Sequence, residues 1–167
     1  YLAIVGDINK KDAQKLVKKL FGKWEEGDVP KPVFEMPQAP EKSFVALVDK
    51  ASAVQSVINI TYPIVLKPGT PDVIKTRVLN QVLGGGSSAR LFVNLREDKG
   101  FTYGAYSSIS SDKLVGEFSA GASVRNEVTD SAIVEFNHEL NRLRNEEISD
   151  EELNLAISSI SGSFARS

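Results

Sequence analysis

Strands are predicted where apolar and polar residues alternate along the chain or where short apolar runs occur. The clearest alternation lies in 114–124, where Phe118, Ala120, Ala122 and Val124 are separated by polar or small residues. That pattern predicts a strand with one packed face, and its small side chains favour close packing under a helix. The predicted strands are 2–8, 44–48, 54–62, 102–110 and 114–124.

Helices are predicted where apolar residues recur every three or four positions. The last two are the most clearly marked, by the stripe Ile133, Phe136, Leu140 and Leu143 and by the stripe Leu153, Ile157, Ile160 and Phe164. Ser149 and Glu152 form a capping box ahead of the second stripe, with Ile148 and Leu153 as its hydrophobic staple. Asn9 and Thr70 are predicted N-caps of earlier helices. Helices are thus expected between Asn9 and Gly22, over 71–83, between Ser88 and Gly100, around 133–143 and after Ser149.

These elements together predict an α+β fold, a two-layer sandwich in which a mainly antiparallel sheet carries helices on one face. Four prolines between residues 27 and 42 indicate an extended linker. We therefore divide the chain into a strand and helix closing a preceding lobe (1–26), the linker (27–42) and a main lobe (43–167). The chain begins inside a strand pattern and ends inside a helical one, so we expect a piece of a longer protein, truncated at its C-terminus.

Composition excludes several classes of function. With 20 basic and 22 acidic residues the net charge is −2, which argues against binding nucleic acid. No apolar run approaches the ~18 residues of a membrane span, so a soluble chain is expected. The absence of cysteine excludes zinc sites built from thiolates. It leaves the cellular compartment undetermined, and we guess the bacterial periplasm or the cytoplasm. His138 is the only histidine and falls on a polar helix flank, so we expect it to be exposed and without function.

Candidate chemistry is concentrated in 84–106, GGGSSARLFVNLREDKGFTYGAY. The three glycines Gly84, Gly85 and Gly86 follow a helix and precede no lysine, so they match a phosphate loop poorly and are interpreted as a flexible joint. Arg96 stands in the last helical turn before Gly100, and Tyr103 stands early in the next strand. A guanidinium and a phenol that converge suit an anion or a polarised carbonyl. The alternative places Arg96 in a surface ion-pair set with its charged neighbours 97–99 and makes Tyr103 an ordinary strand aromatic.

The same segment resembles the M16 family of zinc metallopeptidases, the group of pitrilysin, insulysin and mitochondrial processing peptidase. GGGSSARLFVNLREDKGFTYGAYSS is similar to that family's glycine-rich loop and its arginine and tyrosine motif. VDKASAVQSVINI resembles the preceding strand pair, LAIVGDI with LFGKW the end of the preceding lobe, and EISDEEL the start of the last helix. The resemblance implies the LuxS/MPP-like metallohydrolase fold and covers nearly the whole chain.

In that family one half of a clamshell holds zinc through H-x-x-E-H and the other half carries the Arg and Tyr. The resemblance therefore implies that Arg96 and Tyr103 bind peptide and steady a tetrahedral oxyanion, with Gly84 to Gly86 as a hinge. No zinc motif occurs here, and Arg77 and Gln81 would take the places of two histidine ligands, so this half is expected to bind no metal. The implied partners are a zinc-binding half, in the same polypeptide or a separate subunit, and a peptide substrate.

This fragment is then expected to be part of a zinc metalloendopeptidase and to be inactive when taken alone. Two alternatives stay open from the sequence. One is a catalytically inactive scaffold or assembly subunit with the same fold. The other is a small-molecule binding module, for which the sequence locates no convergent polar pocket.

Overall fold

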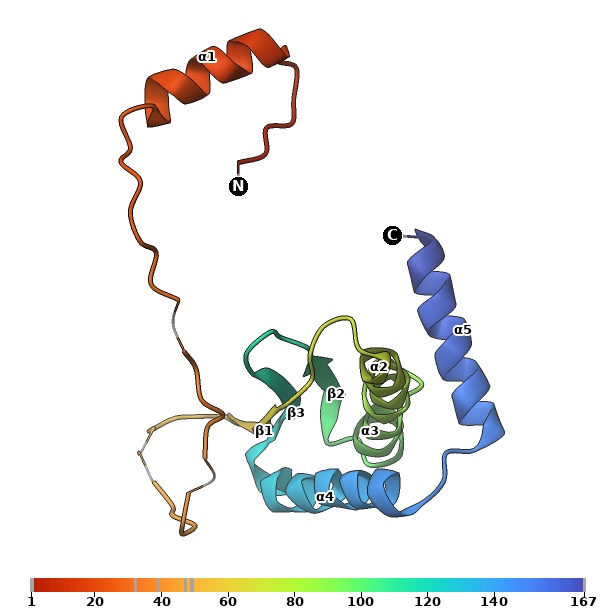
Figure 1. Cartoon of the computed structure of the whole chain (residues 1–167). Helices are drawn as coiled ribbons and strands as arrows, with labels where there is room; N and C mark the ends of the chain where they lie inside the picture. Colours follow the sequence, from red (N-terminus) through yellow and green to blue (C-terminus); the bar gives the residue numbers. More distant parts are fainter. Residues whose placement is uncertain (1, 32, 39, 47, 49, 167) are drawn as a thin grey trace. The chain divides into compact units, whose positions relative to one another are not determined.

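The structure is a computed structural model that describes residues 2–31, 33–38, 40–46, 48 and 50–166. The chain divides into two compact units, Tyr1–Val33 and Phe34–Ser167. The division falls inside the predicted linker 27–42. Figure 1 traces both units, with the first in red and orange.

The first unit is built around α1 (Lys10–Phe21). The Asn9 side chain accepts a hydrogen bond from the backbone N–H of Asp12 at 2.9 Å, so the predicted N-cap is confirmed. Phe21 packs edge-on against Trp24 after the helix ends, with ring centroids 5.0 Å apart. The strand predicted at 2–8 is wrong, because a strand is completed only by hydrogen bonds to a neighbour and none pairs with these residues in the described part of the unit.

In the second unit an antiparallel three-stranded sheet has the order β1-β3-β2. Its strands are β1 (Gln55–Ile64), β2 (Thr102–Ser110) and β3 (Gly116–Arg125). The central strand β3 buries alternate residues, and Phe118, Ala120 and Val124 face the helices. This period of two confirms the one-sided strand predicted there.

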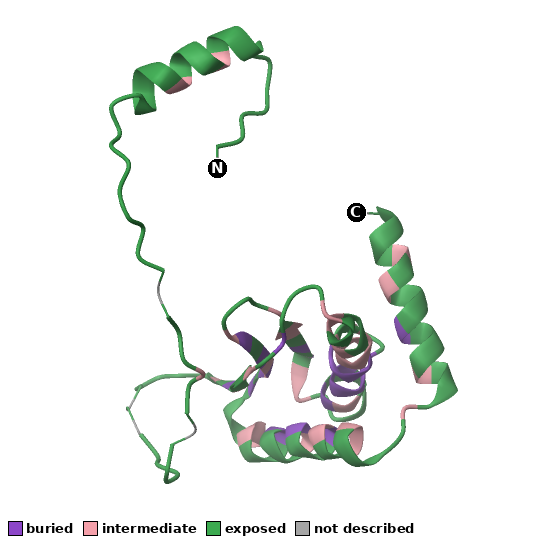
Figure 2. Ribbon diagram, viewed as in Figure 1, coloured by how far each residue is buried: buried purple, intermediate pink, exposed green. Residues whose placement is uncertain are grey.

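Helices cover that one face of the sheet. Figure 2 shows the buried residues on the strands and on the helix surfaces turned toward them. The core joins Leu83, Leu91, Leu95 and Phe136 to the buried face of the sheet. The elements outside the sheet are α2 (Pro71–Leu83), α3 (Arg90–Phe92), the π-helix η1 (Val93–Asp98), the 3-10 helix η2 (Asn126–Val128), α4 (Thr129–Asn145) and α5 (Asp150–Arg166). The predicted α+β class with a mainly antiparallel sheet is confirmed.

Three local predictions in this unit are wrong. The described residues of the predicted strand 44–48, namely 44–46 and 48, form no strand, and Leu47 lies outside the described residues. Thr70 does not cap α2 with its side chain, because its hydroxyl donates to the carbonyl of Lys67 at 2.9 Å. The apolar stripe predicted on α5 is largely exposed at Leu153 and Ile157, because this helix packs on α2 through the small residue Ala156.

The capping box of α5 is confirmed. The backbone N–H of Glu152 donates to the Ser149 hydroxyl at 3.2 Å, and the Ser149 N–H donates to the Glu152 carboxylate at 3.1 Å. Two otherwise unpaired helix donors are satisfied in this way.

Candidate functional site

Tyr103 lies on a β-bulge at the start of β2. Thr102 pairs with Val124 and Ala105 pairs with Ala122, so two residues of β2 oppose one residue of β3. The Thr102 hydroxyl fixes this irregularity, since it lies 2.7 Å from the carbonyl of Ser123 and accepts the Gly104 N–H at 3.2 Å. The bulge turns Tyr103 outward, and the residue is 86% exposed.

Arg96 reaches this bulge from η1. Its Nη1 donates a hydrogen bond to the backbone carbonyl of Tyr103, which brings together the two residues that the sequence singled out. The guanidinium also lies 5.2 Å from the centroid of the Phe92 ring, and its Nε is 3.2 Å from the Glu97 carboxylate. Arg96 therefore forms the ion pair with a charged neighbour that the alternative interpretation predicted, and it contacts the strand at the same time.

A π-turn places Arg96 at the end of its helix. The Lys99 N–H donates to the carbonyl of Asn94 at 3.0 Å, five residues back, which widens the last turn. Gly100 follows with a φ of +62°, the left-handed exit expected of it. The short connection then leads directly into β2, so helix end and strand start are held at one junction.

Polar contacts to α4 hold η1 in place. The amide of Asn94 donates to Glu135 at 3.0 Å and to the buried Glu139 at 2.7 Å. Lys99 pairs with Glu135 at 3.3 Å. The hydrogen bond from Asn94, followed by the contact with Lys99, lowers the pKa of Glu135 and keeps its carboxylate charged.

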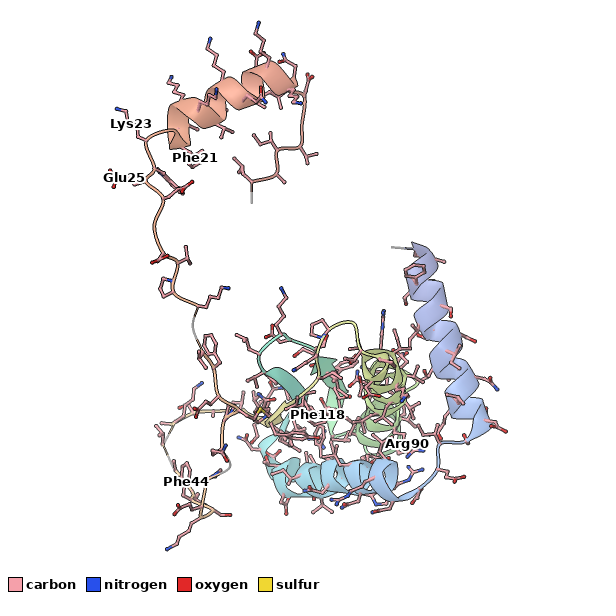
Figure 3. All side chains as sticks on the ribbon, in the orientation of Figure 1. Phe21, Lys23, Glu25, Phe44, Arg90 and Phe118 are labelled. Carbon is pink, nitrogen blue, oxygen red and sulfur yellow. The ribbon has the colours of Figure 1, made fainter. Side chains whose placement is uncertain are left out.

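Arg90 and Glu152 form an ion pair that sequence reasoning missed. Nε and Nη2 of Arg90 donate to the two carboxylate oxygens of Glu152 at 2.6 and 2.9 Å, joining α3 to the first turn of α5. Figure 3 labels Arg90 among the helices of the second unit. The Arg90 side chain is 7% exposed. Its hydrogen bond lowers the pKa of Glu152 from 4.5 to about 2, against the opposing effect of burial. Sixty-two residues separate the partners, so no local pattern points to the pair.

The three glycines at the end of α2 have different surroundings. Gly84 is buried against β2, where its carbonyl accepts the Ser107 N–H at 3.0 Å. A Cβ at this position would overlap the backbone nitrogen of Ser107 and lie 2.9 Å from the carbonyl carbon of Tyr106. Close approach of helix and strand thus explains this glycine, whereas a Cβ on Gly86 would meet only the end of the Gln81 side chain. A hinge at Gly84 to Gly86 stays a prediction.

The face of the sheet opposite the helices is largely polar. On β3 it carries Ser119, Ser123 and Arg125, and across the ladder from them β1 presents Thr61, Val57 and Gln55. Tyr103 lies at one end of this face. The arrangement offers hydrogen-bond donors and acceptors to a molecule lying along the open sheet.

The described residues contain no group of three or more His, Cys, Asp or Glu side chains placed to hold a metal ion. On α2 the side chain of Gln81 donates to the Ser159 hydroxyl at 3.2 Å, and Arg77 is exposed. A guanidinium and an amide are poor zinc ligands, so these two side chains do not fit the zinc site described in the sequence analysis. His138 is exposed, as expected.

A family model described as the peptidase M16 inactive domain matches residues 1–160. The chain belongs to this M16 family. Among curated relatives, the M16 domain is similar to the probable inactive metalloprotease YmfF of Bacillus subtilis (strain 168), with 31% identity over 126 residues, 75% of this chain and 29% of that protein. It is also 34% identical over 86 residues, 52% of this chain and 19% of the relative, to an uncharacterized zinc protease of Streptomyces coelicolor.

Solved structures show the same fold. A peptidase M16 inactive domain from Pseudomonas fluorescens matches with a TM-score of 0.73 and 23% identity, covering 97% of this chain and 39% of that one. A protease from Helicobacter pylori matches with a TM-score of 0.76, 23% identity and the same coverage. The M16 domain thus spans less than half the length of these relatives. None of its described helices combines the length and the apolar character needed to cross a bilayer.

Proposed function

We propose that this domain is the substrate-binding, non-metal half of an M16-type zinc peptidase. Residues 1–26 would close a preceding lobe, 27–42 would link the lobes, and 43–167 would form the half that faces a zinc site in another half or subunit. The relatives named as zinc protease and inactive metalloprotease, together with the match to the inactive domain, support this division of labour. The zinc would then belong to the partner half and supply the Lewis acid for peptide hydrolysis.

The observation that carries the proposal is the contact of Arg96 with the Tyr103 carbonyl at the bulge. Arg96 contacts the backbone of Tyr103, and the Tyr103 residue itself is exposed at the end of the polar sheet face. A phenolic O–H is a neutral donor, suited to the carbonyl oxygen of a bound peptide and to the oxyanion that develops from it. The guanidinium of Arg96 lies at the same junction, where it contacts the Tyr103 carbonyl and pairs with Glu97.

In this mechanism the chain's own residues bind and orient the peptide. The open face of the sheet receives the extended substrate, Tyr103 donates to its carbonyl, and Arg96 fixes the strand from which Tyr103 projects. Donors aimed at developing charge commonly contribute about 3 kcal/mol to transition-state stabilisation. We also propose that the chain moves at Gly84 to Gly86 when the two halves close over the peptide. Gly84 is packed against β2 and Gly85 is exposed, which supports a hinge that begins after Gly84.

In the complete enzyme, we expect Tyr103→Phe and Arg96→Ala each to lower kcat/KM at least tenfold and to leave the zinc content unchanged. Steady-state cleavage of a quenched fluorescent peptide and metal analysis of the purified variants measure both quantities. Tyr106→Phe is the matched control for a lost hydroxyl on the same strand, and Arg144→Ala for a lost exposed arginine. Unchanged turnover in both Tyr103→Phe and Arg96→Ala would overturn the assigned roles.

A catalytically inactive scaffold subunit is the second candidate function, favoured by the similarity to a relative named as a probable inactive metalloprotease. The H-x-x-E-H motif separates the two. Its presence upstream in the parent polypeptide, or in a subunit that copurifies with it, favours the peptidase. Its absence from both favours the scaffold.

A further inference from the structure

A pocket of about 380 Å³ opens beside Tyr103, at the end of the sheet where β1 and β2 begin and β3 ends. The described residues that line it are Gln55, Gly100, Phe101, Thr102, Tyr103, Ser123 and Arg125. Gln55 lies directly across the ladder from Arg125. Polar residues from three strands therefore line one pocket.

Arg125 is the one charged residue among the described residues that line this pocket. Its Nη1 donates to the carbonyl of Gly100 at 3.2 Å, which directs the guanidinium toward the start of β2. In the described part of the chain the side chain makes no ion pair, and its other N–H groups have no hydrogen-bond partner. This contrasts with Arg90, Arg96 and Arg142, each of which is paired with a carboxylate.

The donors in the pocket are complementary to one kind of ligand. Arginine presents N–H groups in a planar fork that matches a carboxylate in two parallel hydrogen bonds. The Gln55 amide and the Tyr103 hydroxyl add neutral donors, and no acidic side chain occurs among the described lining residues. A cationic ligand would meet Arg125 with no compensating anion, and an apolar one would leave the guanidinium unpaired.

We propose that this pocket is a subsite for a carboxylate of the bound peptide, with Arg125 as its specificity-determining residue. The inference rests on the proposed function, because it takes the peptide to lie along the open face of the sheet. Two sources can supply the carboxylate, an aspartate or glutamate side chain within the peptide or the free carboxyl group at its C-terminus. Either would place a substrate anion next to Tyr103 and fix the register of the peptide on the sheet.

Peptide binding to the complete parent protein, measured by fluorescence anisotropy after the metal is removed with a chelator, tests the subsite without relying on turnover. One set of N-terminally labelled peptides carries a single Glu moved stepwise along a neutral sequence with an amidated C-terminus. A second set replaces that Glu with Gln, and a third keeps the Gln and has a free C-terminal carboxylate. The three sets separate the side-chain source from the chain-end source.

The best-placed carboxylate should tighten binding by the wild-type protein about tenfold over its neutral counterpart. In Arg125→Gln this preference should fall to within about twofold, while the neutral peptides bind as before. Arg125→Lys should retain part of the preference, and so should wild-type protein at raised salt, because screening weakens an exposed pair. Arg144→Gln, which removes an exposed arginine on α4, is the matched control and should change nothing.

Two outcomes would overturn the proposed subsite, and a third would also overturn the proposed function. A wild-type protein without carboxylate preference contradicts the subsite, and so does a preference that survives Arg125→Gln. In both cases the proposed function stands if Tyr103→Phe still lowers kcat/KM. Failure to bind any of the peptides contradicts the proposed function as well. Circular dichroism of Arg125→Gln and Arg125→Lys checks that loss of the bond to Gly100 has left the fold intact.

Discussion

Replacing Glu152 with alanine should lower the free energy of unfolding by about 3 kcal/mol. The substitution removes both acceptors of the Arg90 guanidinium and leaves a buried charge without its partner. It also removes the carboxylate of the capping box on Ser149. Two stabilising contacts therefore disappear together, the long-range tie between α3 and α5 and the local cap of α5.

Urea unfolding followed by circular dichroism measures this loss, with Glu151→Ala as the control. Glu151 occupies the same helical turn but is exposed and contributes no ion pair among the described residues, so its variant should lie within about 0.5 kcal/mol of the wild type. Equal effects of the two substitutions would show that the Arg90 pair does not stabilise the fold.

The same pair has a predictable pH dependence. Its folded state holds the pKa of Glu152 at about 2, below the ordinary 4.5, because the charged form is hydrogen-bonded to Arg90. The stabilisation is therefore complete above about pH 4.5 and is lost as the pH falls toward 2. The difference in unfolding free energy between wild type and Glu152→Ala should narrow over that range. A difference that is constant from pH 5 to pH 3 would contradict the ionic origin of the effect.

Substituting Gly84 with alanine should cost about 3 kcal/mol of stability through overpacking. The new methyl group would overlap the backbone nitrogen of Ser107 and lie 2.6 Å from its hydroxyl oxygen. Backbone atoms of a paired strand cannot rotate away as a side chain can, so α2 must shift from β2. That shift would stretch the 3.0 Å hydrogen bond from Ser107 to the Gly84 carbonyl.

Gly86→Ala provides the control, since the nearest atom to its Cβ would be the terminal nitrogen of Gln81 at 3.2 Å. A flexible amide can move by a few tenths of an ångström, and alanine is better tolerated there. Thermal unfolding of both variants should show a marked loss for Gly84→Ala and a small change for Gly86→Ala. The reverse order would contradict the close packing of Gly84 on β2 as the reason for this glycine.

Local signals in the sequence were sufficient for the elements around the site. The helix 71–83 and the strand 102–110 were predicted with the bounds that the structure shows, because Pro71, the glycines and Gly100 mark their ends. The alternation in β3 identified the buried face of the sheet. The capping box located the start of α5.

Features that depend on partners distant in the chain could not be predicted from the sequence. An apolar run such as 2–8 forms a strand only if another strand pairs with it. Likewise, the apolar stripe of α5 is buried only if another surface covers it. The sequence predicted that the Arg96 guanidinium and the Tyr103 phenol converge, whereas the contact in the structure is with the Tyr103 backbone carbonyl. The bulge at this residue arises from pairing with β3, which no local pattern reveals. The Arg90 tie to Glu152 was missed for the same reason.

The bulge at Tyr103 also makes this residue an attachment point for a reporter group. Thr102 and Arg96 hold the bulge through hydrogen bonds to the backbone, so the Tyr103 side chain carries no part of the local fold. The chain contains no cysteine, so Tyr103→Cys would introduce a single thiol, at a position that is 86% exposed in the native residue. A dye placed there would report changes in the surroundings of this end of the sheet.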